Sequence, residues 1–187
     1  MCDLEGPRRL RATTLHSDPE ILEHVRRAEP DLVVIDAPLS IPRGRSTIED
    51  RSGPHLRACD RVLLARRLPF FPITLGPMRM LTVRGMDLAA KLRESGLRVV
   101  EGYPGASQDI LGLPRKSAGV PLLQRRLGAL GLGGDLGRRR LSHDELDAVT
   151  IAWVGWQFQR ERRGELIGDP DEGVMLLPEP RRRRSRG

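Results

Sequence analysis

Two short apolar runs, each followed by an acidic residue and then a proline, place the strongest constraint on the fold of this chain. The first run, Leu32 to Ile35, ends on Asp36, and the stretch LRVVEGYP at 97–104 repeats the pattern with Glu101. Continuous β-branched runs of this length are typical of strands that are buried on both faces of a parallel sheet. Segments with helical periodicity alternate with these runs, so the sequence predicts an α/β fold.

The 187 residues suit one domain, which we place at 1–178, with an Arg-rich tail at 179–187 that we expect to be disordered. Capping residues and apolar spacing predict the helices, and a short apolar run at 173–178 predicts a terminal strand. Pro- and Gly-rich composition predicts loops or linkers at 37–55, 69–77, 102–114 and 131–140. The expected helices are 19–28, 56–68, 82–96, 120–130 and 142–164.

The formal charge of +7 comes mostly from the tail, because residues 179–187 contain five arginines and one glutamate. Such a run is usually solvated, although it also suits a nonspecific contact with nucleic acid that would weaken steeply with salt. Cys2 and Cys59 form neither a CxxC pair nor a disulfide framework, so we expect a reducing, cytoplasmic environment. The chain has no long apolar run that would suit a membrane span.

Four acidic residues are candidates for one site. Asp36 and Glu101 end the two predicted parallel strands, whose carboxyl ends usually meet at one crevice, so we expect both side chains to project into it. Asp144 and Asp147 are three residues apart and therefore share one face of the last predicted helix. Each acid also has an ordinary alternative: Asp36 as a strand cap or an arginine partner, and Asp144 as a favourable charge at a helix N-terminus.

Converging carboxylates suit Mg²⁺ or Mn²⁺, because these cations prefer oxygen ligands. Hydrolysis of a phosphodiester by two metal ions uses three or four such groups, one ion activating water and the other stabilising the leaving oxygen. Asp36, Glu101, Asp144 and Asp147 supply that number, and no Cys or His cluster offers a competing metal site. We therefore expect these four residues to hold the cation, with Asp36, Glu101 and Asp147 as the catalytic acids.

Several separated blocks also carry a family resemblance. The segments VVIDAPLS, RACDR, VVEGYPGAS, LSHDELDAVTIAW and GVMLLP occur in this order between Leu15 and Pro178. This pattern resembles the family called domain of unknown function 429, whose members are predicted to be nucleases with a ribonuclease H-like fold. The resemblance implies a mixed sheet flanked by helices, with Asp36 as the acid of the fourth strand. It also implies that Asp144 and Asp147 correspond to the last-helix acids of Holliday-junction resolvases, while Glu101 is an additional acid.

The resemblance also implies a first strand with its own acid, and this chain has no such segment. Residues 1–18 instead predict the end of a second strand, a turn at Glu5 to Pro7 and a third strand. The first strand is central in that fold, and its absence leaves backbone groups of its neighbours unpaired. We expect either a start upstream of Met1 or a degenerate member of the family.

Three basic residues are candidates for contacts with nucleic acid. Arg57 lies with Asp60 on a predicted helix and could meet a phosphate, although a surface ion pair is the simpler interpretation. Arg115 and Lys116 follow the predicted loop at 102–114 and either contact phosphates or belong to a solvated loop. His143, beside Asp144, is either a residue of the helix N-terminus or a proton shuttle at the metal site.

These observations give two main hypotheses. The first is a metal-dependent nuclease that uses the clustered carboxylates, and the second is a non-catalytic, degenerate module that binds nucleic acid. A relative of the sugar kinases is a third option, but no Gly-rich phosphate loop supports it. Dependence of activity on Asp36 and Asp147 separates the first hypothesis from the second.

Overall fold

The computed structural model describes residues 1–7, 9–50 and 52–180. The predicted tail therefore lies outside the described residues, apart from Glu179 and Pro180. The helices in the described part are α1 (Asp18–Ala28), α2 (Ala58–Ala65), α3 (Gly76–Glu94), α4 (Pro104–Leu111), α5 (Val120–Gly128), α6 (Asp135–Arg138) and α7 (His143–Trp156), with a 3-10 turn η1 (Lys116–Ala118) and a π-helical turn η2 (Gln157–Glu161). The strands are β1 (Cys2–Leu4), β2 (Leu10–Ala12), β3 (Val33–Ile35), β4 (Val99–Gly102), β5 (Glu165–Asp169) and β6 (Gly173–Leu177).

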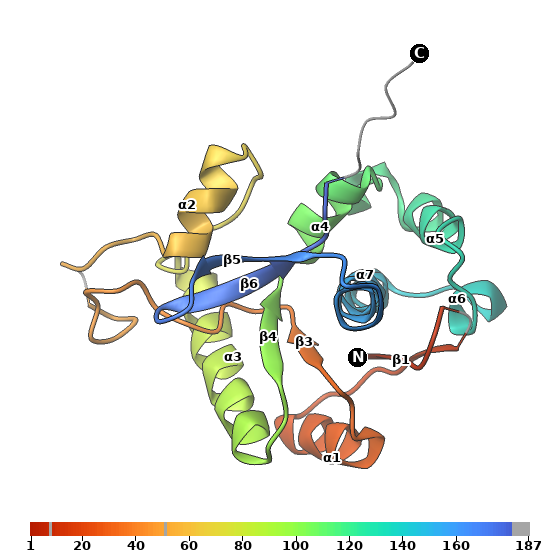
Figure 1. Cartoon of the computed structure of the whole chain (residues 1–187), viewed down its shortest axis with the longest axis horizontal. Helices are drawn as coiled ribbons and strands as arrows, with labels where there is room; N and C mark the ends of the chain where they lie inside the picture. The colour runs from red at the N-terminus through yellow and green to blue at the C-terminus, as the bar shows by residue number, and fades with distance from the viewer. Residues whose placement is uncertain (8, 51, 181–187) are drawn as a thin grey trace.

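The main sheet has four strands in the order β3-β4-β6-β5 (Figure 1). β3, β4 and β6 are parallel, and β5 pairs antiparallel with β6. β1 and β2 form a separate antiparallel pair, as predicted from residues 1–18, and no described strand joins this pair to the main sheet. The expected α/β class, with a mixed sheet and flanking helices, is confirmed.

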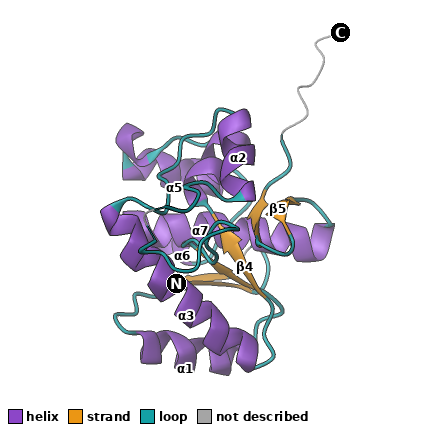
Figure 2. Ribbon diagram, turned by 90° about the vertical axis from the view of Figure 1, so that its left-hand side faces the viewer, coloured by secondary structure: helices purple, strands orange, loops and turns teal. Residues whose placement is uncertain are grey.

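Helices cover the two faces of the β3–β4 pair differently. Val33, Ile35 and Val99 pack on the side of α1 and α3, where Val25, Leu88 and Leu92 are buried. The alternate residues Val34 and Val100 pack on the side of α7. Because successive side chains of a strand point to opposite faces, this alternation defines an α3 side and an α7 side of the sheet. Figure 2 shows α1 below the strands, away from α5.

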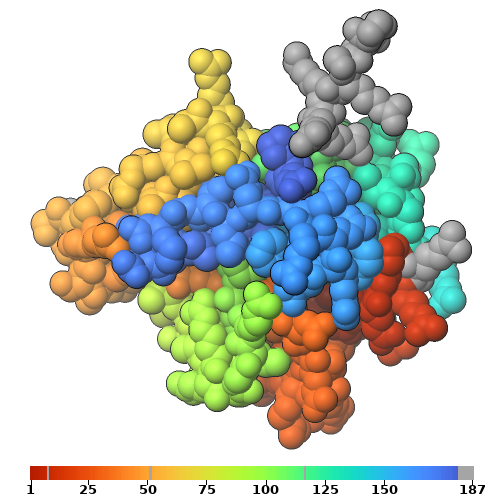
Figure 3. Space-filling model, viewed as in Figure 1, coloured from red at the N-terminus to blue at the C-terminus, as the bar shows by residue number. Residues whose placement is uncertain are grey.

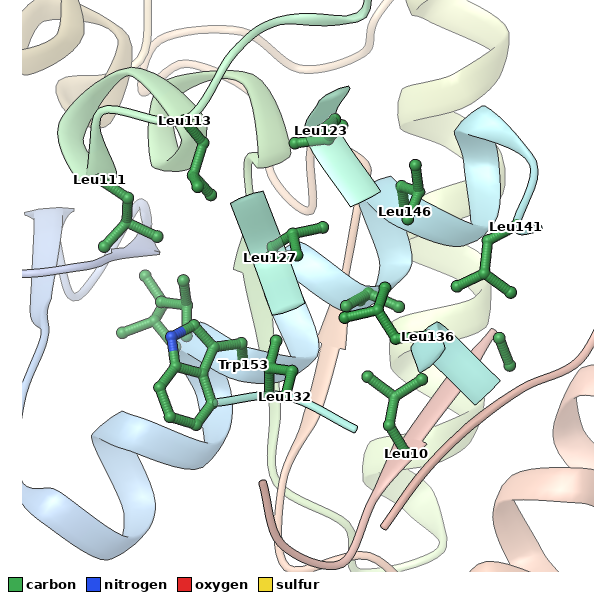
Figure 4. Packing of buried hydrophobic residues seen from close by; sticks show 14 of the residues in the cluster. Leu10, Leu111, Leu113, Leu123, Leu127, Leu132, Leu136, Leu141, Leu146 and Trp153 are labelled. Atoms are coloured by element: carbon green, nitrogen blue, oxygen red, sulfur yellow. The ribbon is translucent and has the colours of Figure 1, made fainter. Parts of the chain in front are cut away.

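The largest core cluster lies on the α7 side and consists mainly of leucines (Figure 4). It joins α7 to α5, α6 and the β1–β2 pair through side chains such as Leu10, Leu123, Leu127, Leu136 and Leu146. Trp153 and Trp156 stack at the end of α7, with ring centroids 5.1 Å apart. A core of this kind fixes α7 in place, and α7 carries two of the predicted site acids.

Local capping explains where the predicted helices begin. Ser17 accepts a hydrogen bond from the Glu20 N–H at the start of α1, and Ser142 with Glu145 forms a capping box at the start of α7.

The C-terminal residues, blue in Figure 3, lie across one face of the molecule, above α3. None of the helices in the described part of the chain is both long and apolar enough to cross a membrane.

The structure differs from the sequence prediction in five places. Residues predicted as a loop form α4, with Pro104 in its first turn and Gly112 as a left-handed C-cap. The predicted linker contains the short helix α6, and α3 begins at Gly76 rather than at 82. The last helix ends at Trp156, and the residues beyond it include β5, which the sequence interpretation missed. β5 is stabilised by antiparallel pairing with β6, which a local pattern does not reveal.

Candidate active site

Close packing of α7 on the sheet brings its acids to the strand ends. A Cβ added at Gly155 would lie 2.8 Å from Val34 Cγ2, and one added at Gly102 would lie 3.2 Å from Ile151 Cγ2. The absence of side chains at these positions lets the backbones approach. Asp147 precedes Ile151 by about one helical turn, so it lies beyond the carboxyl ends of β3 and β4, where Asp36 follows β3.

Asp36 is open to solvent, but other acids and the surrounding protein strongly affect its charge. The surrounding protein removes part of the hydration of its carboxylate, and this is the largest of the effects that raise its pKa to about 7. Repulsion from Asp147, Glu101 and Asp144 raises the pKa further, in that order. Since water still reaches the side chain, the loss of hydration is partial.

Asp147 is held by neighbours on two sides. Gln108 of α4 donates a hydrogen bond from Nε2 to Asp147 Oδ1 at 2.8 Å. His143 Nε2 lies 3.3 Å from Asp147 Oδ2, one turn earlier on α7. Gln108 is buried and Asp147 is partly buried, so this carboxylate has a fixed position at the edge of the site.

Asp144 has a different environment. Its side chain is fully exposed, and its Oδ1 lies 3.6 Å from His143 Nδ1. It acts on Asp36 through its charge, as the weakest of the three acidic contributions. Asp144 and Asp147 therefore both act on Asp36 through their negative charge, Asp147 more strongly than Asp144.

Glu101 does not project into the crevice on the α7 side, which corrects the sequence prediction. In the sheet it pairs with Ile35 and Met175, and Ile35 packs on the α3 side. Asp36 comes one residue after Ile35, so alternation along the strand directs Asp36 and Glu101 to opposite sides. Glu101 also lines a recess of about 290 Å³ together with Leu39 and with Arg93 of α3.

The carboxylate of Glu101 is occupied by Arg57 and a backbone amide. Arg57 donates from Nη1 to Glu101 Oε2 at 2.6 Å and from Nη2 to Oε1 at 2.8 Å. The Leu39 N–H donates to Glu101 Oε2 at 2.8 Å. Burial raises the pKa of Glu101, while the charge of Arg57 and these hydrogen bonds oppose the rise.

Arg57 is only 2% exposed, and Asp60 accepts two further hydrogen bonds from its guanidinium. Burial would lower the pKa of Arg57, but the charge of Glu101 and the hydrogen bonds to Glu101 and Asp60 outweigh burial and raise it. The prediction that Arg57 meets a nucleic-acid phosphate is therefore wrong for this conformation, because the guanidinium is enclosed. The simpler alternative of an ion pair with Asp60 is correct, except that the pair is buried.

Arg115 is paired with Asp109 of α4 and keeps part of its surface open. Its Nε and Nη2 donate to Asp109 Oδ1 and Oδ2, both at 2.7 Å. Burial raises the pKa of the neighbouring Tyr103, the charge of Arg115 opposes the rise, and the charges of Asp109 and then Asp36 add to it. The Tyr103 hydroxyl donates to the Pro69 carbonyl oxygen at 2.6 Å. Arg115 thus holds a fixed positive charge beside Tyr103 and Asp109. Lys116 lies in η1, and its side chain is outside the described part of the structure.

The acids meet the needs of a metal ion only in part. Among residues 1–7, 9–50 and 52–180, no group of three or more His, Cys, Asp or Glu side chains is gathered closely enough to hold one. Mg²⁺ keeps several water ligands and commonly binds through one or two carboxylates together with substrate phosphates. Asp36 and Asp147 fit that requirement in donor type and charge. The described residues do not supply enough ligands for a site built from protein groups alone.

Comparison with known proteins identifies the family. The sequence model of a family described as "Protein of unknown function (DUF429)" matches residues 2–172. The chain belongs to the DUF429 family. No curated protein and no solved structure matches it. The description of the DUF429 family names no activity, so the geometry of the site supplies the functional argument.

In this DUF429 protein, three residues near the site were missed or only partly recognised from the sequence. Gln108 lies on α4, where the sequence predicts a loop, so the sequence places it on no helical face. Nothing in the sequence shows the proximity of Tyr103 to Asp36. His143 is adjacent to Asp144 in the sequence, but its spacing of four from Asp147 indicates the contact on one helix face that the structure has.

Proposed function

We propose that this protein is a metal-dependent nuclease that hydrolyses phosphodiester bonds of nucleic acid, with Mg²⁺ or Mn²⁺ bound at Asp36 and Asp147. The observation that carries the proposal is Asp36: it is open to water at the end of a parallel strand, and three acids raise its pKa. Like charges at this position repel each other, and a divalent cation would relieve the repulsion. Without a cation, ionised Asp36 and Asp147 would repel each other and raise the free energy of the folded protein.

The surrounding residues have distinct roles in this proposal. Asp36 and Asp147 hold the cation, and Gln108 and His143 keep Asp147 in position through the contacts at 2.8 and 3.3 Å. Arg115, fixed by Asp109, orients a substrate phosphate next to the acids. Asp144 adds negative charge from the exposed start of α7. When bound, the cation would neutralise the phosphate and lower the pKa of an attacking water.

We also propose that the fold is ribonuclease H-like in its finer arrangement. Three features support this: the β1–β2 hairpin, the parallel β3–β4 pair, and a helix that brings acids to the end of β3. The position of Asp36 after β3 and of Asp147 on α7 agrees with the roles that the family resemblance implies. Glu101, by contrast, is bound by Arg57 and the Leu39 N–H, and these neighbours do not suit a ligand of the cation.

The test is cleavage of labelled DNA and RNA, single- and double-stranded, with and without Mn²⁺. We expect cleavage that EDTA abolishes and that Asp36→Asn and Asp147→Asn each reduce at least ~100-fold, since each removes a cation ligand. Asp31→Asn is the matched control, because Asp31 is an exposed acid paired with Arg160 away from this site. Circular dichroism of all variants verifies that they are folded.

Two outcomes contradict the nuclease proposal. One is cleavage that persists in both site variants, and the other is no cleavage by a protein that still binds nucleic acid. The second outcome supports the alternative of a non-catalytic binding module. Binding in that case would fall steeply with added salt and would not depend on Mn²⁺.

A further inference from the structure

The buried pair of Arg57 and Glu101 lies directly behind the loop that carries Asp36. From its geometry we infer that Glu101 is a positioning residue, held in place by Arg57, and that it is not a ligand of the cation. Its task is to fix the segment from Asp36 to Leu39 against the end of the sheet. The cation-binding part of this inference rests on the proposed function, whereas the positioning part does not.

The first argument is the arrangement of charge around Glu101. Both carboxylate oxygens accept from the Arg57 guanidinium, in the two-pronged geometry that gives the strongest ion pairs. Glu101 is 4% exposed and Arg57 is 2% exposed, so water does not compete for either group. A cation at Glu101 would have to displace Arg57 or lie beside its positive charge. Either arrangement is unfavourable in a buried environment.

The second argument is direction. Glu101 shares the α3 side of the sheet with its neighbours Ile35 and Met175, while Gly102 faces Ile151 on the α7 side. Asp147 belongs to α7, so Asp36 and Asp147 interact on the α7 side of the sheet, and Glu101 lies on the opposite side. The charge of Glu101 still affects Asp36, but the hydrogen bonds of Glu101 lie on the α3 side.

The third argument is the loop itself. After Asp36 the chain crosses the end of the sheet, and its Leu39 N–H donates to Glu101 at 2.8 Å. On the α3 side a Cβ added at Gly85 would lie 2.7 Å from Ala37 Cβ and 3.0 Å from the Pro38 carbonyl oxygen. The loop is therefore held between α3 and Glu101. Asp36 precedes this anchored stretch and takes its position from it.

Hydrogen exchange at the Leu39 amide tests the positioning role without any metal. We expect Glu101→Gln and Arg57→Lys each to raise the exchange rate at Leu39 about tenfold or more, because each weakens the anchor. Glu145→Gln is the matched control: Glu145 also pairs with an arginine, Arg139, and accepts from a backbone amide, that of Ser142. This control should raise exchange at Ser142 and leave Leu39 unchanged. An unchanged rate at Leu39 in Arg57→Lys overturns the inference.

Affinity for Mn²⁺, measured by titration calorimetry, tests whether Glu101 is a ligand. Arg57→Lys keeps the positive charge but loses the two-pronged contact. If Glu101 only positions Asp36, this variant weakens Mn²⁺ binding by about 10- to 100-fold, as loss of an outer-shell partner does. If Glu101 is a ligand, a weaker competitor frees its carboxylate, and Mn²⁺ binds equally well or more tightly. The latter result overturns the inference.

The two measurements separate failure of this inference from failure of the proposed function. A wild-type protein that binds no Mn²⁺ contradicts the proposed function, while the exchange rate at Leu39 still decides whether Glu101 positions the loop. Arg57→Lys is used in both measurements because it retains a cation beside Glu101 and Asp60. The conclusion therefore does not depend on whether Glu101→Gln folds.

Discussion

Ile151 of α7 packs over Gly102 of β4, and this contact sets the position of Asp147 relative to the end of the sheet. A Cβ at residue 102 would lie 3.2 Å from Ile151 Cγ2 and 2.5 Å from Val34 Cγ1. Any side chain at this position must push α7 away from the strands or displace Val34. The separation of Asp36 and Asp147 therefore depends on a residue with no functional group of its own.

We predict that Gly102→Ala destabilises the protein by about 1–3 kcal/mol, the usual range for overpacking a core contact. Cation affinity should fall as well, because α7 moves with Asp147. Gly137→Ala is the control: no atom lies within 4 Å of its added Cβ, and the residue is in a helix. There alanine should be neutral or stabilise by up to about 1 kcal/mol. Urea unfolding checks both variants, and equal stabilities contradict the packing argument.

The raised pKa of Asp36 predicts a stability that depends on pH. In the unfolded chain its carboxyl ionises near its ordinary value of 3.8, whereas in the folded protein it keeps its proton up to about pH 7. Between these values the folded state binds more protons, so this group makes folding less favourable as the pH rises from about 4 to about 7. Above pH 7 the full destabilisation is present.

Asp36→Asn should therefore stabilise the protein at pH 8, in EDTA, and change its stability little at pH 4. We expect a gain of about 1 kcal/mol, because solvent screens much of the effect at an accessible group. Denaturant unfolding of both proteins at the two pH values is the measurement. A difference between wild type and variant that is the same at pH 4 and pH 8 contradicts the assigned environment of Asp36.

The sequence predicted the frame of the site better than its contacts. Periodicity and capping placed β3, β4, α1 and the start of α7 correctly, because these features follow from local patterns. The carboxyl ends of parallel strands then led to Asp36. What the sequence did not supply was the pairing of Ile35 with Glu101, which determines the side to which each acid points. Register depends on contacts between distant segments, so a local pattern does not contain it.

Long-range partners were missed for the same reason. Arg57 and Glu101 are separated by 44 residues, and Gln108 and Asp147 by 39. In the sequence, Arg57 has only Asp60 within reach on its own helix, and Gln108 stands in a Pro- and Gly-rich stretch that resembles a loop. Pro104 and Gly112 in fact begin and end α4, which are the positions that helices favour for these residue types.

The buried ion pair predicts an unequal cost of removing arginines. Arg57→Ala should destabilise the protein by about 3–5 kcal/mol, because it leaves Glu101 and Asp60 buried without their partner. Arg160→Ala removes an exposed partner of Asp31 and should cost less than about 1 kcal/mol. Thermal and urea unfolding compare the two. Similar losses in both variants contradict the strong coupling assigned to Arg57.

The N-cap of α7 offers a test of whether the start of this helix contributes to the site. Ser142 accepts a hydrogen bond from the Glu145 N–H at 3.2 Å, and Ser17 does the same for the Glu20 N–H of α1 at 3.4 Å. Loss of either cap should cost about 1 kcal/mol. Ser142→Ala should also weaken Mn²⁺ binding, because fraying at the start of α7 displaces His143, Asp144 and Asp147. Ser17→Ala is the control and should leave Mn²⁺ affinity unchanged. Unfolding experiments and Mn²⁺ titrations on the two variants separate these effects. Equal Mn²⁺ affinities in both variants would mean that the first turn of α7 has no part in holding the cation.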